Sequence, residues 1–208
     1  MSETGTREIG STIPGHYGAS ESAVTLSPAT IAAAWNVQGD GARTTVVADV
    51  ARLFGIALPV VPGDTARADA LLALWLGPRS WLLVENSPQQ ATRALAGFEA
   101  ERDALNLGGA ALFDVSASRV AYTIHGAGAA TVLARSCPLD FDARAFAPGR
   151  CAQSMLGRVG ALFYRHAQAP AFTVMVARSL AGDVWHALCV AAATDGYDVA
   201  AAAGFDAR

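Results

Sequence analysis

The chain has 208 residues, of which 52% are hydrophobic and 16% charged, and its formal net charge is −3. This composition excludes an intrinsically disordered chain, because disorder requires low hydrophobicity and high charge, and the acidic balance argues against a nucleic-acid partner held by a basic surface. Lysine is absent, which excludes chemistry that needs a lysine, such as Schiff-base formation or phosphate binding by a P-loop.

The N-terminal segment, residues 1–25, is polar and rich in Gly, Ser and Thr. It predicts an extended arm that cannot fold alone and that is either disordered or lies along a partner. Residues 31–38 permit two interpretations. Ser27 and Pro28 resemble the start of a helix, whereas Trp35, ahead of a Gly-rich turn, fits a strand, which we prefer.

A helix is predicted over residues 42–54, because its apolar side chains fall on one face and Gly55 follows as a C-terminal cap. Two apolar runs come next, residues 71–76 and 81–85, separated by a break at Gly77-Pro78. Gly and Pro favour a turn, and short bounded apolar runs are typical of strands buried on both faces. These runs therefore predict a buried hairpin.

A second helix is predicted to begin at Ser87-Pro88, with its buried face marked by Ala91, Leu95, Phe98 and Leu105. Gly108-Gly109 ends it, and residues 112–116 form the next strand. The order β-α-β-β-α-β predicts a split βαβ (ferredoxin-like) unit, a four-stranded antiparallel sheet with two helices on one face. We assign residues 26–117 to this first lobe.

A second lobe is predicted over residues 118–198, with a similar antiparallel sheet and helices. Its expected elements are strands at 119–124, 152–156, 159–166 and 171–177, a helix at 129–136, a loop at 138–150 and a final helix marked by Leu180, Val184, Leu188 and Ala191. Residues 199–208 form an Ala- and Gly-rich tail. The fold class is therefore α+β, with two lobes that share an interface near residues 116–119.

The sequence predicts a cytoplasmic protein that does not enter a membrane. The longest uncharged run, residues 22–39, contains Ser, Thr, Pro, Asn and Gln and is too polar to span a bilayer. The first residues lack the basic region and apolar core of a signal peptide. The high apolar content has two interpretations, burial against a partner chain or an inflated count from alanine.

Two sequence features suggest ligand chemistry only weakly. Residues 126–131 (GAGAAT) lie between a strand and a helix, where backbone amides could hold a phosphate, but the third glycine of the dinucleotide fingerprint is missing. None of the four histidines has a second His or Cys at metal-ligand spacing. A structural role is therefore preferred for His16, His125, His166 and His186.

Other polar residues also lack the partners that catalysis would need. Asp114 and Ser116 are interpreted as turn residues, and Asp140 and Asp142 lie on a loop with no partner base. Cys137, Cys151 and Cys189 are odd in number and widely spaced, which argues against a disulfide framework, and the first two have no evident activating histidine. Trp75 and Trp81 are interpreted as core, or as anchors for a partner. We therefore predict no catalytic, cofactor-binding or metal-binding residue in this chain.

Six segments carry distinctive motifs, among them residues 74–83 (LWLGPRSWLL), 137–140 (CPLD) and 148–152 (PGRCA). In the same order, they resemble motifs of the gamma subunit of heterotetrameric sarcosine oxidase. Residues 74–83 (LWLGPRSWLL) resemble its WLGPDEWLL-type motif, although Arg79-Ser80 stands where the family usually has an acidic pair. Further likeness lies in residues 114–119 (DVSASR), 125–134 (HGAGAATVLA), 137–140 (CPLD), 148–152 (PGRCA) and 177–179 (ARS). Together the resemblance covers about residues 46–194.

This resemblance implies a non-catalytic structural subunit whose partners are alpha, beta and delta subunits. The family's enzyme demethylates sarcosine oxidatively to glycine, produces hydrogen peroxide and passes the one-carbon unit to tetrahydrofolate. The large subunits carry the NAD, FAD, FMN and folate sites, the delta subunit holds zinc, and the gamma subunit has no known cofactor of its own.

The resemblance also implies a fold like the folate-binding part of the glycine-cleavage aminomethyltransferase. Residues 160–165, which compare with a stretch that carries an acidic pair there, contain no carboxylate, so the catalytic acid of that enzyme is not carried over. Two alternatives remain: a stand-alone folate-binding protein of the aminomethyltransferase type, and a gamma-like subunit of another N-methyl amino acid dehydrogenase.

Overall fold

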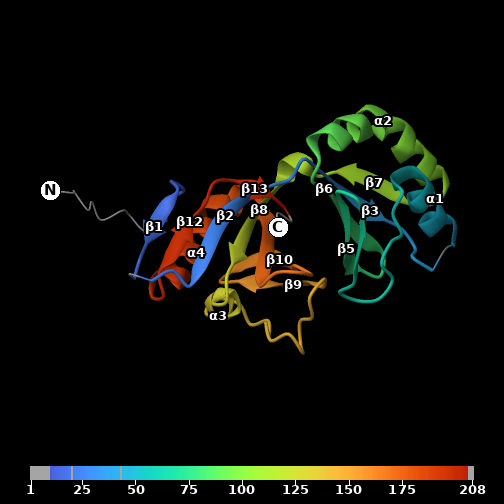
Figure 1. Ribbon diagram of the computed structural model, residues 1–208. Coiled ribbons are helices and arrows are strands. Elements are labelled where there is room, and N and C mark those ends of the chain that lie inside the picture. Colours follow the sequence, from blue (N-terminus) through green and yellow to red (C-terminus); the bar gives the residue numbers. More distant parts are fainter. Residues whose placement is uncertain (1–9, 20, 43, 206–208) are drawn as a thin grey trace.

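The computed structural model describes residues 10–19, 21–42 and 44–205, without the side chains of residues 44 and 93–96. It contains a five-stranded sheet and an eight-stranded sheet. Figure 1 shows the two sheets side by side, with helices α1 and α2 on the outer side of the smaller one. The predicted α+β class with two largely antiparallel sheets is confirmed.

The smaller sheet and its helices form the small-sheet lobe, residues 33–114. Its strands follow the spatial order β4-β5-β6-β3-β7, and every neighbouring pair is antiparallel. Its elements are β3 (Ala33–Gln38), α1 (Thr44–Phe54), β4 (Thr65–Ala68), β5 (Leu71–Gly77), β6 (Ser80–Glu85), α2 (Pro88–Leu107) and β7 (Ala111–Asp114).

The larger sheet and its helices form the large-sheet lobe, built from residues 10–30 and 116–205. Its strand order is β1-β12-β2-β8-β11-β10-β9, and β13 also pairs with β2. Its elements are β1 (Gly15–Tyr17), β2 (Val24–Thr30), β8 (Arg119–His125), α3 (Ala129–Ala134), β9 (Cys151–Leu156), β10 (Val159–Arg165), β11 (Ala171–Ala177), α4 (Ala181–Ala193), β12 (Tyr197–Val199) and β13 (Ala203–Gly204).

Local signals set the helix ends and the hairpin as the sequence predicts. Helix α1 ends at Gly55, whose φ of 67° is the left-handed conformation that glycine adopts without strain. The hydroxyl of Ser87 caps α2 by accepting a hydrogen bond from the Gln90 amide. Strands β5 and β6 pair as the predicted hairpin. Of the predicted buried face of α2, Leu95 lies outside the described side chains.

The molecule is built in four layers: α1 and α2, the small sheet, the large sheet, and α3 with α4. Alternate residues of β3, β5 and β6 face opposite ways, so Trp35 and Leu83 pack under α1 and α2, whereas Leu72 and Leu82 pack against the large sheet. This explains the burial of the hairpin on both faces. The other face of the large sheet is covered by α3 and α4.

The structure corrects the predicted boundaries at both ends of the chain. Residues from Gly10 on, assigned to an arm, contribute β1, which pairs with β12. Strand β2, placed in the first lobe, pairs with β8 in the large sheet, so Ser27 and Pro28 lie in a strand and not at a helix start. The predicted tail contributes β13 and the buried Phe205. Strand β4 was not predicted.

Candidate functional site

A pocket of about 520 Å³ lies where the two lobes meet, and we call it the interlobe pocket. Loop residues Pro62 and Gly63, together with Trp75 of the hairpin, supply its small-sheet side. The large-sheet side comes from the loop before β9 and from the start of β9. The full lining is Pro62, Gly63, Trp75, Leu139, Arg144, Ala145, Phe146, Ala147, Arg150, Cys151, Ala152 and Gln153.

Hydrogen bonds join the two lobes around this pocket. Arg150 forms an ion pair with Asp64 and donates to the carbonyl of Pro62. The Thr65 hydroxyl donates to the Gly149 carbonyl at 2.6 Å, and the Cys151 amide donates to the Gly63 carbonyl at 2.8 Å. The Gln153 amide group donates to the Leu76 carbonyl at 2.6 Å. The polar groups named here are therefore occupied in holding the lobes together.

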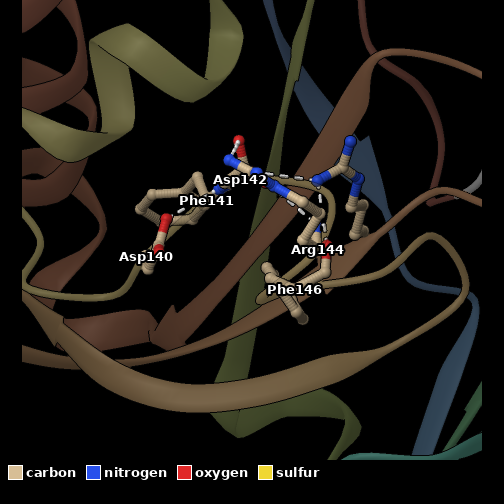
Figure 2. Close-up of polar contacts among 6 residues, drawn as sticks. Asp140, Phe141, Asp142, Arg144 and Phe146 are labelled. Carbon is tan, nitrogen blue, oxygen red and sulfur yellow. Dashed lines mark hydrogen bonds and ion pairs between the residues drawn. The ribbon is translucent and has the colours of Figure 1, made fainter.

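The loop between α3 and β9 is folded by its own carboxylates (Figure 2). Asp140 accepts a hydrogen bond from the Asp142 amide, and Asp142 accepts from both the backbone and the guanidinium of Arg144. These hydrogen bonds to Arg144 hold the pKa of Asp142 below its usual value. Both carboxylates thus serve as turn residues, which is the local role that Asp commonly takes.

Arg165 of β10 holds this loop in place through hydrogen bonds from its guanidinium group. Its Nη1 donates to the carbonyls of Phe141 and Phe146, at 3.0 and 2.9 Å, and its guanidinium lies over the ring of Phe172. Phe141 also packs edge-on against Phe163 and Phe172. The loop is therefore anchored at its centre by one cation and an aromatic cluster.

Cys151 lines the pocket and carries a thiol, a group that can act as a nucleophile, but its environment disfavours this role. Burial raises the pKa of its thiol from 9.0 to about 11, and the sulfur lies 3.4 Å from the Trp75 carbonyl, to which it donates. Only the thiolate is a strong nucleophile. Cys137 and Cys189 are buried too, and all three cysteines are free thiols.

Asp114 and Ser116 form a turn that is hydrogen-bonded to β3. Asp114 accepts from both the amide and the hydroxyl of Ser116, at 2.9 and 2.6 Å. The Ser116 hydroxyl also accepts from the Ala34 amide. The structure thus shows the local hydrogen bonding that the sequence analysis favoured over catalysis.

The glycines of the 126–131 segment make room for a neighbouring strand. Gly126 has a φ of 112°, and a Cβ there would lie 2.7 Å from the Ala23 carbonyl oxygen. A Cβ on Gly128 would lie 3.0 Å from the Ala23 side chain, and the Gly128 amide already donates to the Ala23 carbonyl. Close packing against residue 23 therefore accounts for these glycines without a phosphate.

Hydrogen bonds and ring packing account for three of the four histidines. His16 bonds the Asp198 carboxylate at 2.9 Å and the Ala19 carbonyl, and the Asp198 bond raises its pKa. His166 is buried and bonds the Thr173 hydroxyl at 2.8 Å, with the ring of His125 packed edge-on at 6.0 Å. Burial lowers the pKa of His125. His186 is exposed on α4.

The two tryptophans of the hairpin differ in environment. Trp81 is core, and its indole N–H donates to the Pro59 carbonyl at 2.7 Å, whereas Trp75 is half-buried and lines the interlobe pocket. Across residues 10–19, 21–42 and 44–205, no cluster of three or more His, Cys, Asp or Glu is arranged to hold a metal. No helix in these ranges is both long and apolar enough to cross a membrane.

Sequence reasoning missed the residues that join the lobes. Arg150 and Asp64 lie far apart in the sequence and are residue types usually found on the surface. Arg165 is likewise an ordinary polar residue at the end of a predicted strand. No local pattern marks either role. The interlobe pocket is therefore bordered by an ion pair and hydrogen bonds that join the two lobes.

Comparison with protein families matches residues 38–194 to the sarcosine oxidase, gamma subunit family. A sarcosine oxidase subunit gamma from Corynebacterium sp. (strain U-96) is 31% identical over 119 residues, covering 57% of this chain and 55% of that protein. A sarcosine oxidase subunit gamma from Arthrobacter sp is 33% identical over 121 residues, covering 57% and 56%. The match thus spans about half the length of these curated relatives.

Solved structures give two further likenesses. A chain of the heterotetrameric sarcosine oxidase from Corynebacterium sp. U-96, in complex with pyrrole 2-carboxylate, superposes with a TM-score of 0.73 at 27% identity and covers 86% of this chain and 89% of that one. The glycine cleavage system aminomethyltransferase T from Bartonella henselae gives a TM-score of 0.52 at 14% identity, covering 81% and 46%. The second likeness concerns the fold alone.

Proposed function

The chain belongs to the sarcosine oxidase gamma subunit family, and on that premise we propose that it is a structural, non-catalytic subunit of a heterotetrameric sarcosine oxidase. Its proposed partners are the alpha, beta and delta subunits. The observation that carries the proposal is the family match over residues 38–194, joined to a structural likeness that extends over 89% of one chain of such a complex.

The geometry of the interlobe pocket supports a non-catalytic role. The thiol of Cys151 has a pKa raised to about 11 by burial, so it is not a nucleophile near neutral pH. The carboxylates of Asp140 and Asp142 accept hydrogen bonds within their own loop. A nucleophile, a base and an oxyanion site within mutual reach would be needed for catalysis, and these residues do not provide them.

Under this proposal the reaction takes place in the larger subunits. There sarcosine is demethylated oxidatively to glycine and the one-carbon unit passes to tetrahydrofolate, while molecular oxygen accepts the two electrons and is reduced to hydrogen peroxide. FAD, FMN, NAD, tetrahydrofolate and zinc would be held by the other subunits, and the complex would work in the cytoplasm. This chain would contribute a rigid four-layer body that steadies the flavin- and folate-binding subunits.

Exposed apolar side chains provide surface for such contacts. Val60 and Val61, on the loop after α1, are 65% and 50% exposed, and Phe113 on the edge strand β7 is 49% exposed. Under the proposal, these side chains would be covered by the partner subunits.

A coexpression pull-down tests the proposal, with this chain as bait and an absorbance scan of the eluate. We expect large partner subunits with flavin bands, and then sarcosine-dependent peroxide production by the eluted complex. Expressed alone, the chain should be poorly soluble or weakly folded. A stable, colourless monomer that does not bind the large subunits would contradict the proposal.

Two outcomes would redirect it. Tight binding of tetrahydrofolate by the isolated chain would favour a stand-alone protein of the aminomethyltransferase type. A flavin-containing complex that oxidises a different N-methyl amino acid would favour a gamma-like subunit of another dehydrogenase.

A further inference from the structure

A second pocket, of about 360 Å³, lies inside the small-sheet lobe between the sheet and its two helices, and we call it the helix–sheet pocket. Pockets of this size accommodate a small organic molecule. It is distant in the fold from the interlobe pocket, because the two lie on opposite faces of the small sheet. Its lining is Trp35, Leu53, Phe54, Gly55, Ala68, Asp69, Leu71, Glu85, Gln90 and Glu101.

Trp35 lines this pocket and carries a hydrogen-bond donor that has no acceptor among the described residues. The side chain is fully buried, at 0% exposure, and its Nε1 has no hydrogen-bond partner among the described residues. A buried donor without a partner costs about 1–3 kcal/mol. Such a group in a pocket wall points to an acceptor that comes from outside the chain.

Two glutamates, Glu85 of β6 and Glu101 of α2, bring negative charge into a partly apolar site. Glu85 is 5% exposed, and one of its oxygens accepts from the Ser87 amide at 2.7 Å. Glu101 of α2 has neither a hydrogen bond nor an ion pair with the described residues, and burial raises the pKa of its carboxyl. Carboxylates removed from water require a partner cation or donors.

The described side chains that line the pocket provide no such cation. Asp69 and Gln90 complete its polar lining, and no Arg or His is among the described lining residues. The bond from the Ser87 amide explains Glu85 in part, because it fixes the turn into α2. That bond leaves Trp35 and Glu101 unexplained.

The aromatic side chains supply the remaining element of recognition. Trp35 and Phe54 pack with their ring centroids 5.8 Å apart, and both line the pocket. Aromatic faces attract cations, and tryptophan does so most strongly. Aromatic rings, carboxylates and one N–H donor together suit a positively charged ligand that also carries an acceptor atom.

We propose that the helix–sheet pocket binds a small organic ammonium ion that carries a hydrogen-bond acceptor. The ammonium group pairs with the carboxylates of Glu85 and Glu101, its carbon atoms pack on Trp35 and Phe54, and its acceptor receives the Trp35 N–H. The site is independent of the sarcosine chemistry proposed for the large subunits.

Equilibrium dialysis with radiolabelled ethanolamine tests the proposal, because ethanolamine joins an ammonium group to a hydroxyl oxygen. The full chain is used together with whatever subunits copurify with it, or by itself if none do, so that failure of the subunit assignment leaves this test intact. Unlabelled ethylene glycol and glycolate are the competitors, since they match ethanolamine in size and are neutral and anionic. We expect neither to displace the label at concentrations where unlabelled ethanolamine does.

Variants locate the binding in this pocket. Glu101→Gln should weaken binding by about tenfold and Trp35→Phe by about fivefold, because each removes one polar contact of typical strength. Glu99→Gln, an exposed site on the same helix, is the matched control and should leave binding within about twofold of the wild type. Should Trp35→Phe fail to fold, Glu101→Gln decides alone.

Three results would overturn the proposal: no ethanolamine binding that differs between the wild type and Glu101→Gln, equal displacement by ethylene glycol, or the same loss in Glu99→Gln. Binding by the wild type that falls in Glu101→Gln and persists in Glu99→Gln would support it.

Discussion

The interlobe pocket and the helix–sheet pocket lie on opposite faces of the same sheet and differ in whether their polar groups are paired. Around the interlobe pocket, Arg150 is paired with Asp64, and the Cys151 amide and thiol are both engaged. In the helix–sheet pocket, the N–H of Trp35 has no partner among the described residues, and Glu101 has no ion pair with them. A buried polar group without a hydrogen-bond partner requires an explanation. The proposed ligand of the helix–sheet pocket supplies one, whereas the polar groups of the interlobe pocket are paired with groups of the chain.

Burial alone does not make this distinction. Both pockets are lined by tryptophan, both have charged residues, and both exceed the volume of a single water site by a wide margin. What separates them is the hydrogen-bond count of each buried group, which is set by the surrounding fold. The following changes test the two sides of this contrast, from the largest expected effect to the smallest.

Removal of the Arg165 guanidinium should have the largest effect. In Arg165→Met the carbonyls of Phe141 and Phe146 lose a shared charged donor, which should cost about 3 kcal/mol in local stability. Hydrogen exchange of residues 138–150 in the purified chain or its complex measures the loss. The exposed Arg158→Met should leave that exchange nearly unchanged, and equal effects of the two variants would show that Arg165 does not anchor the loop.

Cys151 should stay unreactive as long as the lobes are joined. Its pKa of about 11, raised by burial from 9.0, leaves roughly 100-fold less thiolate at neutral pH than an ordinary cysteine has. Iodoacetamide alkylation followed by mass spectrometry should therefore label Cys151 slowly at pH 7.5, and quickly once urea unfolds the chain. Fast labelling of the folded chain would show that the Cys151 thiol is neither buried nor held by its hydrogen bond in the interlobe pocket.

The same pKa gives a direction for stability against pH. Between pH 9.0 and about 11 the folded state keeps the thiol proton that the unfolded state has lost. Folding therefore binds a proton in this range, and the free energy of unfolding falls as the pH rises through it.

A matched pair of tryptophan variants compares the polar groups on the helix-facing side directly. Trp81→Phe leaves the Pro59 carbonyl without its 2.7 Å donor, whereas Trp35→Phe removes an N–H that has no partner among the described residues. Both side chains are almost fully buried, so the lost ring volume is similar. Trp81→Phe should be more destabilising by about 1–2 kcal/mol in urea unfolding, and equal losses would mean that the Trp35 N–H is satisfied.

Local signals account for the parts of the fold that the sequence predicted. The helix over residues 42–54 and the hairpin need only periodicity, a cap and a turn, all of which lie within a few residues of one another. The turn roles of Asp114 and Ser116 are local in the same way. The strand at residues 33–38 competes with a helical interpretation because Ser27-Pro28 resembles a helix start, and only pairing with β6 and β7 distinguishes the two.

Contacts between distant residues account for what was missed. Strand β1 exists because His16 and its neighbours pair with residues 197–199, at the other end of the chain, and a polar segment carries no local sign of such a partner. The pairing of Arg150 with Asp64 is equally invisible in the sequence. The helix–sheet pocket was missed because the pattern around Trp35 predicts burial and says nothing of whether the indole N–H finds an acceptor.

The pair that ties β1 to β12 should give the smallest effect, because it lies in solvent. The hydrogen bond that His16 donates to the Asp198 carboxylate raises the pKa of His16 above 6.5, so the charged pair is complete below pH 6.5 and is lost as the pH rises through the raised value. Hydrogen exchange of residues 15–17, corrected for the intrinsic effect of pH, should therefore be slower at pH 6 than at pH 8. His16→Gln should abolish this difference and leave the exchange of β10 unchanged. A difference that persists in His16→Gln would show that another titrating group causes it and that the His16–Asp198 pair does not stabilise β1, which would then be held by its backbone pairing and by the stacking of Tyr17 on Tyr197.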